Sequence, residues 1–287
     1  MENKPREYTG IITKKFQLTK TVFHFVIQNE NPAKLTFQAG QYATFIIDEK
    51  TRRQYSFCSA PNTTSFELLV DTSPMGAGSQ YFLKLKEGER VEYLAPLGNF
   101  TLSENSLKKI FVATGAGIAP FRSMILNEME ITNSKSQIPN PPAGEAGQIQ
   151  NPSNPPSDLR LPSISLYWGL RYEEDMYWDK EFCAIAEQYT GFQYYLCLSK
   201  PSDGWEKSIP PLLSVRRAKG HVTEHVLKNS SFAKPACRRG RASADKEKNL
   251  QNCEFYLCGN RSMIEEMVVR LQDKNIEDER IKTDMYY

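Results

Sequence analysis

The stretch FVATGAGIAPFRSM, residues 111–124, decides the fold of this chain. An apolar run ends in Gly115-Ala116-Gly117, and a helix-like segment begins near Pro120. Glycines let a backbone turn sharply and approach a ligand, while a helix N-terminus presents free N–H groups to anions. Proline suits the first helical turn, where its missing N–H costs nothing. The pattern is GxGxxP rather than GxGxxG, so alone it fits a nucleotide-binding loop and an ordinary strand-to-helix turn about equally.

The residues that follow keep this strand-then-helix rhythm to the C-terminus. Compact apolar runs alternate with helix-like segments, and these runs are 108–115, 164–170, 192–199, 254–259 and 280–287. Such alternation predicts a parallel α/β sheet with right-handed crossovers. Ligands of open parallel sheets bind beyond the carboxyl ends of the strands, so we expect Gly115, Gly117, Cys258 and Gly259 to converge on one crevice. Cys258 has a structural interpretation as well, because buried cysteines are usually small apolar side chains.

The first hundred residues have a different pattern. From 8 to 102, short strand-like runs are separated by turn signals without amphipathic helices, which predicts a small antiparallel β-barrel. We therefore expect a barrel over 1–104 and an α/β domain over 105–287. Two stretches of the second domain, 134–162 and 207–248, read as flexible inserts. In the second insert we expect a short helix in KGHVTEHVLK and irregular chain in SIPPLLSVRRA, and its basic tracts fit solvated loops better than a docking surface.

One strand of the predicted barrel carries unexpected charge. RRQYSFCSAP, residues 52–61, is either an edge strand with solvated arginines or a strand that grips a flat, charged ligand. Side chains alternate across a strand, so Arg53 and Tyr55 share one face, and Ser56 could join them only through a local twist. Arg52 is expected to be a solvated neighbour.

A glycine-rich stretch in the barrel also fits an anion. GAGSQYF, residues 76–82, contains Gly76, Gly78 and Ser79, which could begin a short helix whose N–H groups hold a phosphate. The alternative is a plain connection with a serine N-cap.

Composition excludes several classes of function. The 36 Lys and Arg residues nearly balance the 34 Asp and Glu residues, which argues against a nucleic acid as partner. None of the six cysteines forms a CxxC pair, so we expect neither a zinc site nor any other metal centre. The sequence contains no signal-like segment and no run of 18 apolar residues, so no membrane insertion is expected, and reduced thiols fit a cytoplasmic protein.

Taken together, the motifs resemble those of the ferredoxin–NADP reductase superfamily of flavoproteins. The matching order is RxYS, GxxS, PxGxF, TGxGIAP, CG with a nearby methionine, and a terminal aromatic residue. The residues that carry it are Arg53, Tyr55, Ser56, Gly76, Ser79, Pro96, Gly98, Phe100, Thr114 to Pro120, Cys258, Gly259 and Met263. The resemblance covers nearly the whole chain except the two inserts.

The resemblance implies an FAD-binding barrel followed by an NAD(P)H-binding domain. Arg53 would contact the flavin diphosphate, Tyr55 the isoalloxazine and ribityl region, and Ser56 flavin N5. The segment from Gly76 through Gly78 to Ser79 would add N–H groups to the same diphosphate. The loop from Thr114 to Pro120, with Gly259 and Met263 near it, would hold the nicotinamide dinucleotide. Cys258 would lie near the nicotinamide C4, and both Ser56 and Cys258 would be catalytic residues.

The C-terminal sequence IKTDMYY adds to the resemblance, most closely to the bacterial ferredoxin/flavodoxin reductase subgroup. It implies catalytic roles for Asp284 and Tyr286, with the ring of Tyr286, or of Tyr287, stacked on the flavin face where the nicotinamide must bind. Arg171, Ser199 and Lys200 follow strands at positions where NADP-specific relatives bind the 2′-phosphate, which favours NADPH over NADH.

The resemblance therefore implies an enzyme that transfers electrons between NADPH and a separate ferredoxin or flavodoxin through FAD. Two alternatives remain open at this point. One is an NADH-dependent reductase component for an oxygenase or cytochrome. The other is a non-catalytic docking protein on a reductase fold.

Overall fold

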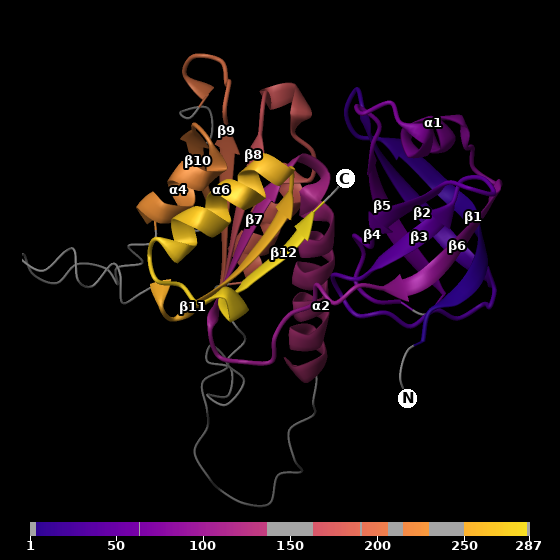
Figure 1. Ribbon diagram of the computed structural model, residues 1–287, viewed down its shortest axis with the longest axis horizontal. Helices are drawn as coiled ribbons and strands as arrows, with labels where there is room; N and C mark the ends of the chain where they lie inside the picture. Colours follow the sequence, from indigo (N-terminus) through magenta and orange to yellow (C-terminus); the bar gives the residue numbers. More distant parts are fainter. Residues whose placement is uncertain are drawn as a thin grey trace, which may run out of the picture.

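A computed structural model of the chain describes residues 4–62, 64–136, 163–189, 191–205, 215–229 and 250–285. They form two domains, a barrel and an α/β domain, with the long helix α2 (Ala119–Ser136) standing between the two sheets (Figure 1). No helix in these ranges is long and apolar enough to cross a bilayer.

The first domain is an antiparallel barrel, as predicted. Its sheet has the order β4-β3-β6-β1-β2-β5, and the strands are β1 Arg6–Gln17, β2 Val22–Asn31, β3 Tyr42–Ile46, β4 Arg52–Ser56, β5 Ser65–Asp71 and β6 Arg90–Leu97. A bridge between Phe57 and Leu68 joins the end of β4 to β5. Helix α1 (Ala77–Lys84) follows β5, and its Phe82 packs edge-on against Phe25 and Phe45 in the barrel core.

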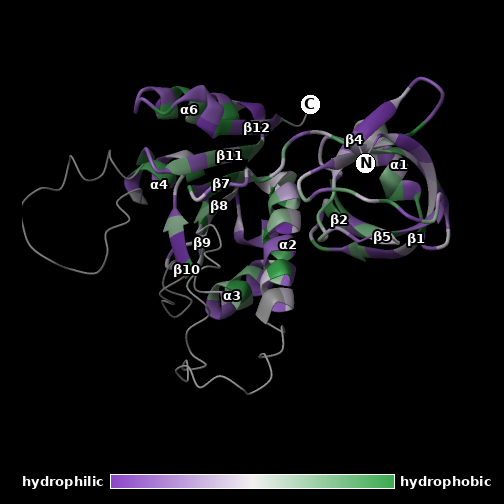
Figure 2. Ribbon diagram, turned by 90° about the horizontal axis from the view of Figure 1, so that it is seen from below, coloured by the Kyte–Doolittle hydropathy of each residue, from purple (hydrophilic) through white to green (hydrophobic). Residues whose placement is uncertain are grey.

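The second domain is the predicted parallel sheet, in the order β10-β9-β8-β7-β11-β12. Its strands are β7 Lys108–Thr114, β8 Ile164–Leu170, β9 Phe192–Leu198, β10 Val215–Lys219, β11 Cys253–Gly259 and β12 Ile281–Met285. The helices besides α2 are α3 Asp179–Gln188, α4 Val222–Asn229 and α6 Arg261–Gln272, with 3₁₀ turns η1 Gly115–Ile118, η2 Glu173–Asp175 and η4 Asp278–Arg280. Helices cover both faces of the sheet (Figure 2).

This double cover explains why the strands of the second domain are continuously apolar. In β7, Phe111 and Ala113 lie in the cluster that includes the residues of α2 and α3, while Ile110 and Val112 lie in the one that includes those of α4 and α6. A strand buried on both faces cannot show the alternating pattern of the barrel strands. Period-two side-chain alternation still assigns each residue to one face.

The structure corrects the expectations for the two inserts in part. Helix α2 continues to Ser136, so the first residues of the 134–162 stretch are helical, and the stretch from 137 to 162 lies outside the described residues. In the second stretch, α4 is the short helix expected in KGHVTEHVLK. The segment VRRAK, which we expected to be irregular, is strand β10 at the sheet edge. A five-residue strand with charge on a sheet edge has little apolar periodicity by which to recognise it.

Candidate active site

Two glycine-containing loops interlock at the carboxyl ends of β7 and β11. A Cβ on Gly117 would lie 2.4 Å from the carbonyl oxygen of Cys258, and a Cβ on Gly259 would lie 2.2 Å from Oγ1 of Thr114. Gly259 also has a φ of +137°, which side-chain-bearing residues rarely adopt. Oγ1 of Thr114 in turn accepts a hydrogen bond from the backbone N–H of Asn260, at 2.9 Å. Glycine is therefore required in both loops by the contact itself.

The turn before α2 is held by hydrogen bonds from two aromatic side chains. The carbonyl of Gly115, where φ is +53°, accepts hydrogen bonds from Nε1 of Trp168 at 3.0 Å and from the hydroxyl of Tyr177 at 3.1 Å. Burial raises the pKa of Tyr177 far above its ordinary value, so its phenol stays a neutral donor. Two buried aromatic side chains thus fix the loop of the GxGxxP motif. Pro120 is the second residue of α2 and is buried.

Three predicted catalytic side chains meet between the two domains. Cys258 and Asp284 are register partners on β11 and β12, and Sγ of Cys258 lies 4.0 Å from Oδ2 of Asp284. Ser56, the last residue of β4 in the barrel, donates a hydrogen bond to the Asp284 carboxylate. Burial raises the pKa of Asp284, and the Ser56 hydrogen bond opposes part of this rise. A carboxyl group with this environment can hold a proton under conditions in which a surface aspartate cannot.

The side chains of Arg53, Tyr55 and Ser56 on β4 contact different parts of the protein. Arg53 and Tyr55 share the face of β4 that is turned toward α1, because a Cβ on Gly78 of α1 would meet Oη of Tyr55 at 2.4 Å and Cγ of Arg53 at 3.0 Å. Ser56 instead is buried and reaches the second domain, where it meets Asp284. Arg53 and Tyr55 thus lie on the α1 side of β4, while Ser56 contacts the second domain.

Around Gly78 the structure forms a cradle that a side chain would fill. Gly76 is the N-cap of α1 and has open space around it, while Gly78 and Ser79 lie buried in the first turn. The helix N-cap is Gly76, so the alternative of a serine N-cap at Ser79 is wrong. The ring of Tyr55 packs edge-on against Phe82, with 4.7 Å between ring centroids, and burial raises its pKa to about 12. The exposed guanidinium of Arg53 and the N–H groups at the start of α1 suit a diphosphate. The neutral phenol of Tyr55 suits the flat ring system of a cofactor.

The far end of α1 is also anchored. Nζ of Lys15 donates hydrogen bonds to the carbonyls of Phe82, Leu83 and Leu85, at 3.1, 2.9 and 2.7 Å. A cation suits the negative end of a helix dipole. Lys15 therefore holds α1 in place from the end opposite to the glycine cradle.

A cavity of about 700 Å³ runs along the carboxyl ends of the strands of the second domain. Among the predicted residues, its lining includes Thr114, Gly115, Arg171, Ser199, Lys200 and Met263. Arg171 and Lys200 follow β8 and β9, and they are tied by a hydrogen bond from the Lys200 backbone N–H to the Arg171 carbonyl, at 2.9 Å. The cavity is long enough along the sheet edge to pass from the interlocked loops to these two cations.

Several residues of this cavity were not singled out from the sequence. They are contributed by the barrel (Thr19, Thr21, Asp71 and Ser73), by the segment after β10 (His221 and Thr223) and by the start of α6 (Asn260, Ser262 and Glu266). The barrel residues lie at the end of β5 or in connections between elements, and they carry no local signal of a ligand. Asn260 had one, since an asparagine before a helix is a typical N-cap, and its Oδ1 does accept a hydrogen bond from the Met263 N–H, at 2.8 Å. Tyr286 and Tyr287 lie outside the described residues.

Comparison with known proteins agrees with this geometry. Residues 9–102 match the model of an oxidoreductase FAD-binding domain, and residues 111–268 match that of an oxidoreductase NAD-binding domain. The chain is 26% identical over 250 residues to one component of the Na⁺-translocating NADH-quinone reductase of Neisseria meningitidis, covering 83% of this chain and 50% of that protein. The chain thus spans about half the length of the curated relatives it matches.

Solved structures show the same fold over the whole chain. A ferredoxin–NADP⁺ reductase from Neisseria gonorrhoeae with bound FAD and NADP superposes with a TM-score of 0.65, at 20% identity and full coverage of both chains. The Amycolatopsis cytochrome P450 reductase GcoB gives a TM-score of 0.71 at 21% identity, covering 99% of this chain and 71% of that one. With both domain families matched and the fold shared, this chain belongs to the ferredoxin–NADP reductase superfamily of flavoprotein oxidoreductases.

Proposed function

We propose that this protein transfers electrons between NADPH and a ferredoxin or flavodoxin through one bound FAD. The observation that carries the proposal is the meeting of Ser56 from the barrel with Cys258 and Asp284 from the nucleotide domain. When bound, FAD would take up hydride from the nicotinamide and pass electrons on one at a time. The protein must then bring the two cofactors together at the line where the domains meet, which is where these three side chains lie.

The barrel side of the site would bind FAD through the groups around Gly78. The guanidinium of Arg53 and the free N–H groups of Gly76, Gly78 and Ser79 would hold the diphosphate. Tyr55 would lie against the ring system, where a neutral aromatic side chain suits a flat cofactor.

Ser56, Cys258 and Asp284 would bind the proton at the flavin and border the nicotinamide. The Ser56 hydroxyl can donate or accept a hydrogen bond at a flavin nitrogen that changes protonation. Asp284, whose pKa is raised, is hydrogen-bonded to Ser56 and would exchange a proton with it. Cys258 would border the nicotinamide.

NADPH is the proposed nucleotide because two cations line the far part of the cavity. Arg171 and Lys200 would bind the 2′-phosphate together with the hydroxyl of Ser199, whereas a ribose hydroxyl is typically bound by a carboxylate. Lys200 acts as a point charge without the bidentate fork of an arginine.

A stopped-flow comparison tests the proposal directly. Protein reconstituted with FAD is mixed with NADPH or NADH, and flavin absorbance is followed with and without ferredoxin or flavodoxin. We expect reduction at lower concentrations of NADPH than of NADH, and we expect Arg171→Ala with Lys200→Ala to remove this preference. Failure to bind FAD would refute the proposal and favour a non-catalytic docking protein.

A second candidate is an NADH-dependent reductase component for an oxygenase or cytochrome. The observation that favours it is the likeness to components of NADH-quinone reductases. In that case NADH reduces the flavin at least as well as NADPH, and the Arg171 and Lys200 substitutions leave the preference unchanged.

A further inference from the structure

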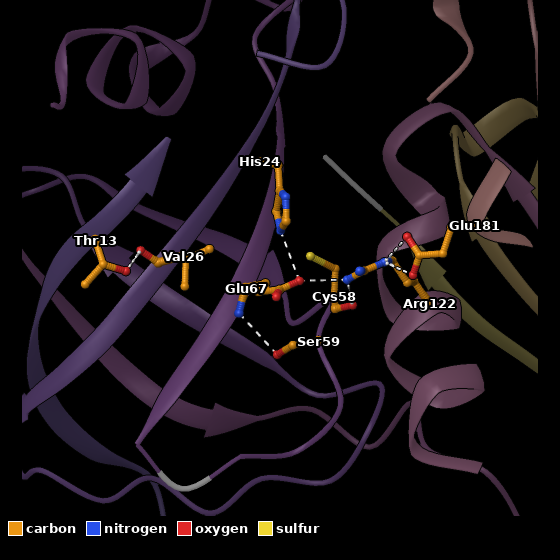
Figure 3. Close-up of polar contacts among 8 residues, drawn as sticks. All are labelled: Thr13, His24, Val26, Cys58, Ser59, Glu67, Arg122 and Glu181. Atoms are coloured by element: carbon orange, nitrogen blue, oxygen red, sulfur yellow. Dashed lines mark hydrogen bonds and ion pairs between the residues drawn. The ribbon is translucent and has the colours of Figure 1, made fainter. Parts of the chain in front are cut away.

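One arginine ties the two domains together beside the site. Arg122, in the first turn of α2, is 11% exposed and lies between the barrel and α3 (Figure 3). Its Nη1 donates to the carbonyl of Cys58 at 2.8 Å and to Oε2 of Glu67 at 2.7 Å, both in the barrel. Its Nε donates to both carboxylate oxygens of Glu181 in α3, at 2.9 and 3.2 Å. A single guanidinium fork is thus shared between the two domains.

The segments that Arg122 joins are those that lead into the proposed chemistry. Cys58 comes two residues after Ser56, so the bonded carbonyl belongs to the chain that leaves β4. Arg122 itself comes two residues after Pro120, at the start of the helix that follows the GxGxxP turn. The Arg122 side chain therefore links the segment that follows β4 to the start of α2, just after the GxGxxP turn.

A strained tryptophan completes the arrangement. The Arg122 guanidinium lies over the Trp178 ring, 4.5 Å from its centroid, and the ring of His24 meets Trp178 edge-on at 5.5 Å. Trp178 has a φ of +55°, which is a costly conformation for a bulky residue and persists only where neighbours hold it. The residue before it is Tyr177, whose hydroxyl holds the Gly115 carbonyl of the nucleotide loop.

The Glu67 carboxylate is kept ionised by its two neighbours, His24 and Arg122. Burial alone would raise the pKa of Glu67, yet hydrogen bonds and charge from His24 and Arg122 hold it at about 2. The donor atoms of His24, Cys58 and Glu67 lie within 4.8 Å of one another and could in principle chelate a metal ion. Oε2 of Glu67 is already bonded to Arg122, however, so the cation that the cluster holds is the guanidinium.

Apolar packing across the same interface does not depend on Arg122. Val22, Leu69 and Phe100 of the barrel belong to one hydrophobic cluster with residues of the second domain, and the Phe100 and Phe121 rings lie 5.7 Å apart. Such contacts are non-directional. Hydrogen bonds are directional, and the Arg122 fork supplies two of them to the barrel, in addition to the one between Ser56 and Asp284.

We propose that Arg122 is a positioning residue that sets the alignment of the flavin on the barrel with the nicotinamide on the α/β domain. This inference rests on the proposed function. Hydride transfer demands close approach of the two reacting atoms, and a misplacement of about 1 Å can cost about 100-fold in rate. Loss of the fork therefore slows the transfer step itself more than it weakens the binding of either cofactor.

The test compares Arg122→Met with Arg217→Met. Arg217 is a matched control: its side chain is 5% exposed, pairs with Asp179 at 2.7 Å and lies over the Trp205 ring, but all these partners belong to the second domain. Each variant is loaded with FAD and mixed with saturating NADPH or deuterated NADPH in a stopped-flow instrument. FAD and NADPH dissociation constants are measured separately.

For Arg122→Met we expect flavin reduction at saturating NADPH to fall about 10- to 100-fold, with an enlarged isotope effect and dissociation constants within about threefold of wild type. Arg217→Met should keep the wild-type rate. Equal rates for the two variants, or a loss confined to the dissociation constants, would overturn the inference.

Two further variants keep the test decisive if Arg122→Met does not fold. Arg122→Lys keeps the charge without the fork, and Glu181→Gln weakens the α3 end while Arg122 stays paired with Glu67. Both should slow reduction at saturating NADPH, and a wild-type rate in both contradicts the positioning role. If wild-type protein binds FAD but NADPH does not reduce it, the proposed function fails and this inference fails with it; reduction that proceeds normally in all Arg122 and Glu181 variants overturns only the inference.

Discussion

Adding one methyl group at Gly78 should weaken FAD binding without unfolding the protein. In Gly78→Ala the new Cβ would lie 2.4 Å from Oη of Tyr55 and 3.0 Å from Cγ of Arg53, whereas ordinary contact begins at 3.4 Å. The Tyr55 hydroxyl must therefore move by about 1 Å. Its ring is confined by Phe82 and Phe45, at 4.7 and 5.8 Å between centroids, so the movement meets packed neighbours.

The magnitude follows from this clash. Overpacking of this kind costs about 1–3 kcal/mol, while replacing glycine by alanine in a helix stabilises it by about 1 kcal/mol. The unfolding free energy of the FAD-free protein should thus change little. Because the displaced groups are the ones proposed to bind FAD, the dissociation constant should rise by about 5- to 150-fold.

The assay is titration of FAD-free protein with FAD, followed by flavin fluorescence, alongside thermal unfolding. Gly191→Ala is the control, because its Cβ would make only ordinary contacts with Tyr189, at 3.4 to 3.5 Å, and the residue lies in the second domain. If Gly78→Ala binds FAD as tightly as Gly191→Ala does, the groups around Gly78 do not hold the cofactor and the assignment of this site is wrong.

Three further contacts can be tested by substitution. Lys15→Met removes the donor from three carbonyls at the end of α1 and should lower the unfolding free energy by about 1–2 kcal/mol in urea titrations, with little loss in Lys15→Arg. The pKa of Glu67 is about 2 in the folded protein, below the unfolded value of about 4.3, so its stabilisation is present above that value and is lost as the pH falls toward 2. Unfolding free energy should therefore fall more steeply from pH 6 to pH 3 in wild type than in Glu67→Gln, and parallel curves would contradict this. Lys109 and Glu254 form a buried pair at 2.5 Å, so Lys109→Met should cost about 3–5 kcal/mol at pH 7, and adding Glu254→Gln should recover much of it.

Much of the fold could be predicted because its signals are local. A sharp change from short alternating strands to apolar strands followed by helices predicted a barrel and a parallel α/β domain, and both are confirmed. Glycines at 115, 117 and 259 showed where a backbone must turn or approach another chain segment. The expectation failed at β10, because an edge strand of five residues with two arginines has no apolar pattern.

The sequence by itself determined which residue types stand at the ends of the strands, since motif spacing and side-chain alternation are properties of the chain alone. It placed Arg53 and Tyr55 on one face of β4 and predicted that Cys258 and Gly115 share a crevice. Only the tertiary structure decided that Ser56 faces the other domain and donates to Asp284, a contact between residues more than two hundred positions apart. It also decided that Arg122 joins the two domains, because a guanidinium finds its partners only when packed helices and strands bring distant carboxylates within hydrogen-bonding distance.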